Sequence, residues 1–431
     1  MKSVSRLALG AALAIAASGV LVPAPADAQR APRPGQTARP PQASFQVAGR
    51  TLNLSAQERT ALVALQQAAT GTDRAAQDAA LAAAQPVVRG PDARYAFARF
   101  QMAIAVQRND NAMLSQAVDA VIASGVAPET EMPTFLNSQY DFATQARDFA
   151  KAERALTRLS ALQPGNADIQ ARLAQLRINQ NRTAEGIRTL QAAIAAQQAT
   201  GQPVPQNWYQ FGLRHSVDST DPAVRSQFMP FARGLLAAYP TPENWRHILV
   251  IYRERANLDA QASIDLSRLM LASGSLAGER DYYEFANSLN QGGYPAEAKA
   301  VIDAGVARRM IDPARSPFRE LITVAGNRIA ADRADLPASQ RAALAAATGT
   351  AALRTGDAFL GHARYSDAIA LYQAALQKGG VDANVVNTRL GIAYALAGQR
   401  ALAEAAFRAV TGPRADIAAF WMIWLQQRPA G

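Results

Sequence analysis

Two stretches near the C-terminus decide the fold. Thr355–Ala375 reads TGDAFLGHARYSDAIALYQAA, and Leu390–Val410 reads LGIAYALAGQRALAEAAFRAV. A glycine, an alanine and an aromatic residue recur in both stretches with a period of 35 residues: Gly356 and Gly391, Ala368 and Ala403, Tyr372 and Phe407. A fixed period of this length indicates a repeat in which each unit is one supersecondary element.

The spacing within each stretch predicts a pair of helices. Residues four positions apart lie on one face of a helix, so Leu390 and Tyr394 share a face of the first helix. Ala403 and Phe407 do the same on the second helix. Glycine at 391 and alanine at 403 let the two helices approach closely, and the ring of Phe407 fills the space beside them. The sequence therefore predicts helix pairs stacked one upon another.

Related patterns extend towards the N-terminus. One unit in residues 134–198 has large and small residues in the same order: Leu136, Tyr140, Ala143, Ala152, Leu156, Leu159 and Pro164. The next unit carries Leu173, Ala174, Gly186, Leu190 and Ala193. In the central part, Trp208, Trp245 and Tyr282 are 37 residues apart and are expected to pack inward. Residues 313–347 lack the pattern, and we expect a helix pair there, with Pro313 and Pro337 as breaks.

These positions resemble the tetratricopeptide repeat (TPR), whose units carry Leu-Gly, Tyr, Ala, an aromatic residue, Ala and Pro at set intervals. The resemblance covers most of residues 91–411. It implies an all-α fold, a right-handed α-solenoid (superhelix) of stacked TPR-like helix pairs. It also implies that the first helix of each pair lines a concave groove, where such proteins bind protein or peptide partners.

Composition agrees with an all-α chain and leaves the charge open to two interpretations. Hydrophobic residues make up 49% and aromatic residues 7%, and much of the apolar share is alanine, the best helix former. The formal net charge is +10, carried almost entirely by arginine. A basic balance fits nucleic acid, anionic membranes or acidic polymers. An arginine bias also fits a genome-wide preference and a solvated surface.

The N-terminus has the features of a secretory signal. Lys2 and Arg6 precede an apolar stretch from Leu7 to Val22, and Ala26-Asp27-Ala28 is a small-residue cleavage pattern. We expect cleavage before Gln29 and export to the periplasm, with outer-membrane association left open. An uncleaved anchor is the alternative, although the stretch is short for a membrane span. No other long apolar run exists in the sequence, so the exported product is not expected to span a membrane.

The breakers and patterns divide the chain into seven segments. The expected segments are a signal peptide (1–28), a Pro/Arg-rich linker with a short extended arm (29–54), N-terminal helical pairs (55–130), TPR-like repeats (131–200), longer irregular repeats (201–347), a C-terminal TPR pair (348–412) and a capping helix (413–431). In the arm, Phe45 to Leu54 predicts a small hairpin, and Ser55 and Glu58 form a capping box that starts the first helix. Trp421 and Trp424 are expected to pack on the last repeat, the alternative being an exposed aromatic docking surface.

No catalytic, metal or cofactor site is evident. The three histidines, His215, His247 and His362, lack partners at ligand spacing, and there is no cysteine. No nucleophile elbow, phosphate loop or dinucleotide fingerprint is present. The acidic pair Asp332 and Asp335 is placed at a helix end and does not suggest acid–base chemistry. We therefore expect a binding protein and not an enzyme, with no cofactor.

The groove can be placed on the central helices. A residue that follows an inward-packing aromatic residue is turned about 100° around the helix and should face the groove. This rule selects Tyr209, Arg246 and Tyr283, and one or two turns further on lie Arg253, Asn287 and Asn290. Together they predict an aromatic, basic and amide-lined strip for a peptide or an acidic glycan. The alternative is that they are solvated surface residues.

Three functions remain open at this point. The first is a periplasmic scaffold or adaptor for protein partners in a cell-envelope process, as the resemblance to exported TPR proteins implies. The second is direct binding of cell-wall glycan or an acidic exopolysaccharide in the groove. The third is the non-catalytic remnant of a superhelical wall hydrolase, although a separate catalytic domain finds no room after the repeats. Nucleic acid is not an expected partner, because of export.

Overall fold

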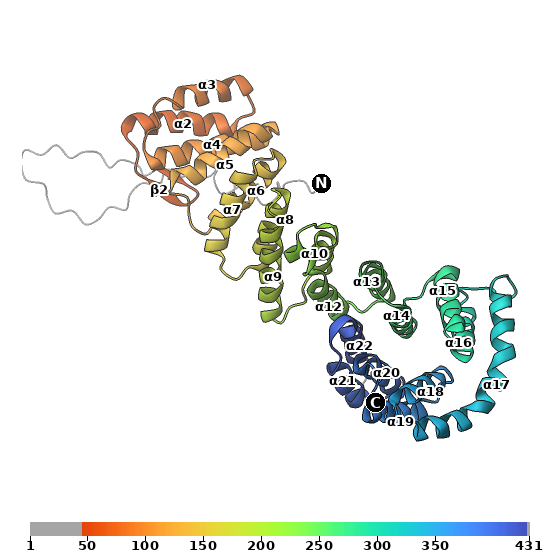
Figure 1. Cartoon of the computed structure of the whole chain (residues 1–431). Coiled ribbons are helices and arrows are strands. Elements are labelled where there is room, and N and C mark those ends of the chain that lie inside the picture. The colour runs from red at the N-terminus through yellow and green to blue at the C-terminus, as the bar shows by residue number, and fades with distance from the viewer. Residues whose placement is uncertain (1–44, 429–431) are drawn as a thin grey trace, which may run out of the picture. The chain divides into compact units, whose positions relative to one another are not determined.

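The computed structural model describes residues 45–428 and is almost entirely helical (Figure 1). The signal peptide and the Pro/Arg-rich linker predicted for residues 1–44 lie outside the described residues. The chain separates into two compact units, of which the first ends at Gln202 and the second begins at Pro203. Stacked helix pairs make up both units, which confirms the all-α repeat fold.

The first unit begins with the predicted hairpin. Strands β1 (Phe45–Val47) and β2 (Arg50–Leu52) pair antiparallel through a turn at Ala48 and Gly49, which both have positive φ angles. Phe45 is buried edge-on against Phe100 at 6.4 Å between ring centroids. The hairpin therefore covers one side of the first hydrophobic core.

Helix pairs complete the first unit. They are α2 (Ala56–Thr70), α3 (Arg74–Ala84), α4 (Pro91–Arg108), α5 (Asn111–Ser124), α6 (Met132–Gln145), α7 (Phe149–Leu162), α8 (Ala167–Asn179) and α9 (Thr183–Ala199). The predicted capping box is present, because the Ser55 side chain accepts from the Glu58 amide and the Glu58 carboxylate accepts from the Ser55 amide. These bonds satisfy backbone donors that the first turn of α2 would otherwise leave unpaired.

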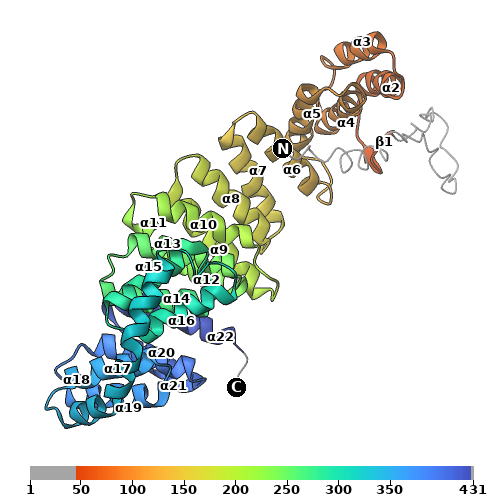
Figure 2. The same ribbon diagram turned by 90° about the vertical axis from the view of Figure 1, so that its right-hand side faces the viewer.

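The second unit is also built from paired helices, and α17 is much longer than the others. Its elements are α10 (Gln206–Asp218), α11 (Pro222–Arg225), α12 (Phe228–Ala238), α13 (Pro242–Arg255), α14 (Ala260–Ala272), α15 (Gly278–Gln291), α16 (Pro295–Ala307), α17 (Phe318–Ala345), α18 (Gly349–Gly361), α19 (Tyr365–Lys378), α20 (Ala383–Leu396), α21 (Arg400–Arg408), the 3-10 helix η1 (Gly412–Arg414) and α22 (Ala415–Gln426). Figure 2 gives a second view of these helices.

The glycine and aromatic positions that revealed the repeat lie against each other. A Cβ atom at Gly391 would stand 2.5 Å from the ring of Phe407, and one at Gly356 would stand 2.8 Å from the ring of Tyr372. These positions thus require glycine because an aromatic side chain of the second helix occupies the space of the missing methyl group. The same contact, between a glycine of the first helix and an aromatic ring of the second, occurs in α18–α19 and in α20–α21.

Residues 318–345 form one helix, so the expected helix pair in this region is wrong. Helix α17 runs through Pro337, which lies exposed within it, and Figure 1 shows the helix bending along its course. Proline removes one backbone hydrogen bond and usually kinks a helix. Arg333, whose carbonyl group loses its partner, is exposed like Pro337, so water can replace that bond.

The second unit closes on itself through its last helix. Helix α22 packs on α20 and α21, and also on α12 and α14 from the start of the same unit. Both tryptophans are buried, with Trp421 stacked on Phe407 at 6.1 Å and edge-on to Trp424 at 5.3 Å. On the far side, Phe420 meets Tyr252 of α13 at 5.3 Å. The aromatic residues of α22 therefore bridge the two ends of the unit and do not form an exposed docking surface.

Candidate binding surfaces

Three of the six predicted groove residues meet in one cleft. Arg253 of α13 and Tyr283 and Asn287 of α15 line a cavity of about 490 Å³ between α13, α14 and α15. Serine hydroxyl groups of α14 and α15 line it as well, at Ser263, Ser267 and Ser288. The cleft thus has the aromatic, basic and amide character that the sequence predicts.

Charges of both signs surround this cleft. Arg253 lies 3.8 Å from a carboxylate oxygen of Glu284, and Arg280 reaches the same carboxylate at 2.7 Å. Glu254, also in the lining, has no ion pair with any residue that the structure describes. The ring of Tyr283 stands edge-on to Phe318 at 6.2 Å, which fixes its orientation. Half-exposed ion pairs of this kind contribute little to stability and can exchange for a ligand's charges.

Tyr209 does not face a groove, so its placement from the sequence is wrong. Its side chain is only 3% exposed. A Cβ atom at Gly234 would lie 2.5 Å from the Tyr209 ring, so the tyrosine fills the space that this glycine leaves on α12. The rule that a residue after an inward aromatic residue faces solvent fails here because α10 is covered by α12 on that side.

Arg246 and Asn290 lie outside the cleft lining. Arg246 forms an ion pair with the buried carboxylate of Asp281 and donates a hydrogen bond to the Ser275 carbonyl oxygen at 3.3 Å. The positive charge of Arg246 is therefore balanced by a carboxylate of the protein itself. The side-chain oxygen of Asn290 is buried without a hydrogen-bond partner among the described residues. Neither residue is positioned like the three that meet in the cleft.

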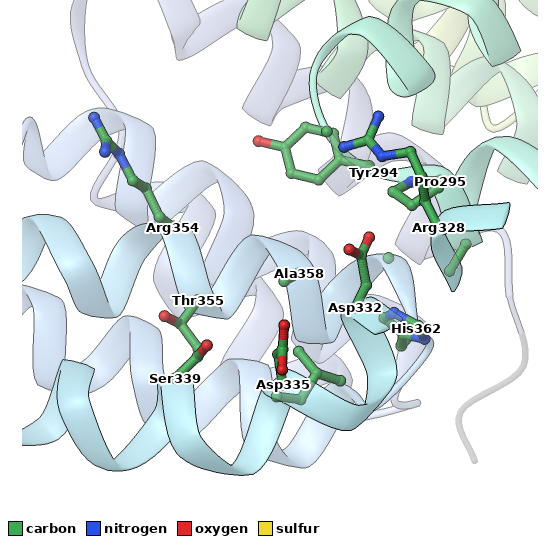
Figure 3. Close-up of a pocket in the computed structure, with 14 residues that line it drawn as sticks. Tyr294, Pro295, Arg328, Asp332, Asp335, Ser339, Arg354, Thr355, Ala358 and His362 are labelled. Atoms are coloured by element: carbon green, nitrogen blue, oxygen red, sulfur yellow. The ribbon is translucent and has the colours of Figure 1, made fainter. Parts of the chain in front are cut away.

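A second, polar cavity was not predicted from the sequence. It has a volume of about 330 Å³ and is lined by α17, α18 and the turn between α15 and α16 (Figure 3). Arg328, Asp332, Asp335 and Ser339 face it from α17, at spacings of four, three and four residues. This spacing places the four residues on one face of a helix, provided that the helix continues through Pro337. The sequence analysis treats Pro337 as a break and therefore does not connect them. Asp332 and Asp335 lie within α17 and not at a helix end.

A third cavity, of about 740 Å³, opens over a buried network of charges. It is lined by residues of α14, α18 and α20 and by Arg414 of η1, and it shares Tyr294 and Arg354 with the polar cavity. Beneath it, Arg389 contacts Asp357 at 2.5 Å, and the Tyr372 hydroxyl donates to the same carboxylate at 2.8 Å. Arg389 also donates to Gln261 of α14.

Asp265 is the centre of this network. It is fully buried and is paired with Arg268 at 2.8 Å and with Arg414, while Arg389 lies 3.8 Å away. Arg268 also holds Glu297 through two hydrogen bonds of 2.7 Å each. Each buried arginine thus has a carboxylate partner, which offsets the cost of removing both charges from water. The network joins α14 and α16 to α20 and η1 across the inside of the unit.

Burial changes the protonation of three groups near these cavities. It raises the pKa of Tyr294 to about 12, and it raises the pKa of Asp357 against the opposing effect of Arg389. Burial also lowers the pKa of His362, with Asp332 acting in the opposite direction. At neutral pH, Tyr294 and His362 are therefore uncharged walls of the polar cavity.

Two kinds of feature are absent from residues 45–428. In that range, no group of three or more histidine, cysteine or acidic side chains is arranged to hold a metal ion. Within the same range, none of the helices combines the length and the apolar character needed to cross a bilayer.

The comparisons with known proteins address the family. Residues 143–202, which end α6 and include α7, α8 and α9, match the family model for the tetratricopeptide repeat. This segment of the chain therefore contains tetratricopeptide repeats. Helices α7, α8 and α9 of this segment belong to a repeat type that serves protein–protein interaction. A search of curated proteins finds no match to it.

A solved structure, that of yeast Tom70, aligns with 75% of this chain and with 86% of its own chain, at 10% identity. The TM-score of that alignment is 0.21, which is too low to support an argument about how the two chains correspond. The tetratricopeptide repeats of residues 143–202 are therefore identified from the family match.

Proposed function

We propose that this TPR protein is an exported scaffold that binds protein partners in the cell envelope. The proposal combines the repeat fold with the signal-like N-terminus, in which basic residues, an apolar stretch and Ala26-x-Ala28 occur in order. Repeat arrays offer extended surfaces that suit elongated protein ligands. Neither a motif nor a metal-binding cluster among the described residues suggests catalysis.

The cleft of α13, α14 and α15 is the proposed partner site. The observation that carries this choice is the position of α22, which packs on the second helices α12 and α14. The chain's own C-terminal helix therefore covers part of the second helices, while the first helices α13 and α15 contribute Arg253, Tyr283 and Asn287 to an open cleft. A partner that docks on this part of the unit meets these three side chains.

The lining indicates an extended, polar peptide segment. Asn287 and the serine hydroxyl groups can hydrogen-bond to a peptide backbone, and Tyr283 supplies a rigid aromatic surface. Arg253 and Glu284 offer one charge of each sign, so neither a strongly acidic nor a strongly basic ligand is favoured. Tyrosine and arginine are also the residue types that most often dominate interface energetics.

Site-specific photocrosslinking tests the location of the site. A photoreactive amino acid at Tyr283 should crosslink to a specific protein in cells, and the same group at the exposed Leu402 of α21 should not. A crosslink at neither position, or the same products at both, would contradict the proposed site. Salt-sensitive retention of purified cell-wall glycan without any protein partner would support glycan binding instead.

Cell fractionation with N-terminal sequencing tests export. The mature protein should be recovered in the periplasmic fraction and should begin near Gln29. Recovery in the cytoplasm with an intact N-terminus would contradict the envelope role and leave the binding site to be judged by crosslinking alone.

A further inference from the structure

The middle of α17 is exposed on nearly every side. Of residues 326–335, all of which the structure describes, Ile329 and Asp332 are half-buried and the others are exposed. The buried residues of α17 lie towards its two ends, at Phe318, Leu321, Ala325, Leu336 and Ala343. Helices in proteins owe most of their stability to tertiary packing, so the solvated middle of α17 bends at lower cost than its packed ends.

Two helix-weakening residues bracket this exposed stretch. Gly326 begins it, and Pro337 lies just beyond its end. Glycine loses more backbone entropy in a helix than any other residue, and proline removes a helical hydrogen bond, so both lower the cost of bending. A Cβ atom at Gly326 would meet nothing within 4 Å, so packing does not require glycine there. Residues 326–337 therefore have the exposure and the composition of a hinge.

The two ends of α17 belong to different groups of helices. At its start, Phe318 stands edge-on to Tyr283 of α15 at 6.2 Å, and α17 packs on α16. At its end, Lys378 of α19 donates a hydrogen bond to the Leu344 carbonyl oxygen at 2.9 Å, and α17 packs on α18. Helices α10 to α16 form the first arm of the second unit, and α18 to α22 form the second arm. The exposed middle of α17 thus connects the two arms.

The arms meet again at α22, away from α17 (Figure 1). Phe420 of α22 contacts Tyr252 of α13 at 5.3 Å between ring centroids. Gln427, next to the end of α22, donates a hydrogen bond to the Leu236 carbonyl oxygen at 2.8 Å and accepts one from the Trp245 indole at 3.2 Å. Helix α22 therefore closes the unit at a distance from the hinge.

The inner faces of the arms enclose cavities. The polar cavity of about 330 Å³ and the larger one of about 740 Å³ are each lined by residues of both arms, including Tyr294 of the first arm and Arg354 of the second. Figure 3 shows Tyr294 and Arg354 on different helices that border the polar cavity. Packed protein interiors contain few voids larger than a water molecule. Separating the arms along these cavities therefore loses fewer close contacts than separating two packed helices would.

The buried charges are paired within each arm. In the first arm, Arg268 binds Asp265 at 2.8 Å and Glu297 at 2.7 Å. In the second arm, Arg389 contacts Asp357 at 2.5 Å. The charged contacts that cross between the arms include those of Asp265 with Arg389 and with Arg414. Asp265 and Arg389 thus keep a partner in their own arm when the arms separate, which lowers the cost of opening.

We propose that the second unit is a clamp whose two arms open and close. Its hinge is the stretch of α17 from Gly326 to Pro337, and its closing contact is that of η1 and α22 with α12, α13 and α14. Helix α14 contributes Ser263 and Ser267 to the partner cleft and Asp265 to the closing contact. Opening of the clamp therefore frees one wall of that cleft from the second arm.

Double electron–electron resonance between two spin labels tests the clamp. The chain contains no cysteine, so Ala237→Cys on α12 and Leu402→Cys on α21, both at exposed positions, place one label on each arm. This pair should give two populations of distances, closed and open. Leu402→Cys with Gln377→Cys on α19 places both labels on the second arm and should give a single narrow distribution. A single narrow distribution for both pairs would overturn the proposal, and no partner is needed, so the result is independent of the proposed function.

Matched variants of the labelled protein locate the moving parts. Arg414→Gln removes a charged contact between the arms and should raise the ratio of open to closed molecules at least about tenfold. Arg408→Gln, whose ion pair with Glu404 lies within α21, is the control and should leave the ratio unchanged. Circular dichroism confirms that each variant is folded. Equal ratios in Arg414→Gln and Arg408→Gln would overturn the closing contact.

The hinge is tested by two changes at exposed positions of α17. Gly326→Ala strengthens the helix and should narrow the distances between the arms, whereas Ala331→Gly weakens it and should broaden them. Neither change removes a buried side chain, so both variants should remain folded. Identical distance distributions in these two variants would overturn the placement of the hinge in α17.

Discussion

Asp265 is the single carboxylate shared by three arginines that come from different parts of the second unit. Arg268 lies on the same helix, Arg389 on α20 and Arg414 in η1, and Asp265 itself is fully buried. Replacing one partner of a buried ion pair leaves the others charged and uncompensated, which costs far more than the pair contributes when intact. Asp265 therefore has a structural role that no sequence motif predicts.

Asp265→Ala should reduce the free energy of unfolding by about 3–5 kcal/mol. Urea unfolding followed by circular dichroism measures this change. Asp303→Ala is the matched control, because Asp303 pairs with Lys299 in an exposed position, and its loss should cost no more than ~1 kcal/mol. Similar effects in both variants would contradict the assignment of Asp265 as the centre of a buried network.

The hydrogen bonds of Glu58 predict that the stability of the first unit falls in acid. Its carboxylate accepts hydrogen bonds from the amides of Ser55, Arg89 and Gly90 at 2.9–3.0 Å. Burial opposes ionisation, but these backbone bonds outweigh it together and lower the pKa from 4.5 to about 2. A group whose pKa is lower in the folded state contributes stability above its unfolded pKa. That contribution is fully present above pH 4.5 and is lost as the pH falls to about 2.

Glu58→Gln should therefore lower stability at pH 7 and weaken the acid dependence between pH 4.5 and 2. Thermal unfolding across that range measures both effects. Glu129→Gln, at an exposed position without an ion pair among the described residues, should change neither. An unchanged acid slope in Glu58→Gln would show that other carboxylates control this transition.

At the scale of the helix pair, the glycine and aromatic contact explains why the repeat has its sequence. Gly391→Ala would place a methyl group 2.5 Å from the Phe407 ring, and overpacking of this kind costs about 1–3 kcal/mol. Gly326→Ala in α17 meets nothing within 4 Å and should be neutral or stabilising, by up to ~1 kcal/mol. Chemical unfolding of both variants distinguishes the two sites, and equal effects would contradict this role of the glycine and aromatic contact.

The last helix connects elements that are far apart in the sequence. Phe420→Ala removes a buried ring that touches Tyr252, and it should cost about 3–5 kcal/mol. Because α22 packs on both ends of the unit, hydrogen exchange should rise in α12 and α14 as well as in α20. Leu402→Ala, at a residue that is 50% exposed, is the control. Faster exchange confined to α20 and α21 would mean that α22 is a simple cap.

The sequence predicts elements of this kind well when the signal is local. Helix pairs, the hairpin at Phe45 and the cap at Ser55 follow from periodicity and from side-chain chemistry over a few residues. The course of α17 does not, because an exposed proline is tolerated when water can take over the lost hydrogen bond. The return of α22 to α12 also lies beyond local patterns, since its aromatic residues fit a terminal cap equally well.

At the scale of the whole molecule, the candidate site was partly predictable for the same reason. Arg253, Tyr283 and Asn287 reach one cleft because helical periodicity places them on neighbouring faces of α13 and α15. Tyr209 is buried because Gly234 on a different helix makes room for it, and Arg246 is committed to Asp281. Such pairings depend on contacts between helices, which a single helix's pattern does not contain.

The proposed function requires that the protein holds a protein partner in the cleft of α13, α14 and α15. The most direct test is a crosslinked affinity pull-down from envelope extracts, comparing the wild type with a variant carrying Arg253→Ala, Tyr283→Ala and Asn287→Ala. The account predicts that the variant folds normally and loses a specific partner that the wild type retains. Recovery of the same partners by both proteins would contradict it and would place the binding surface elsewhere on the repeats.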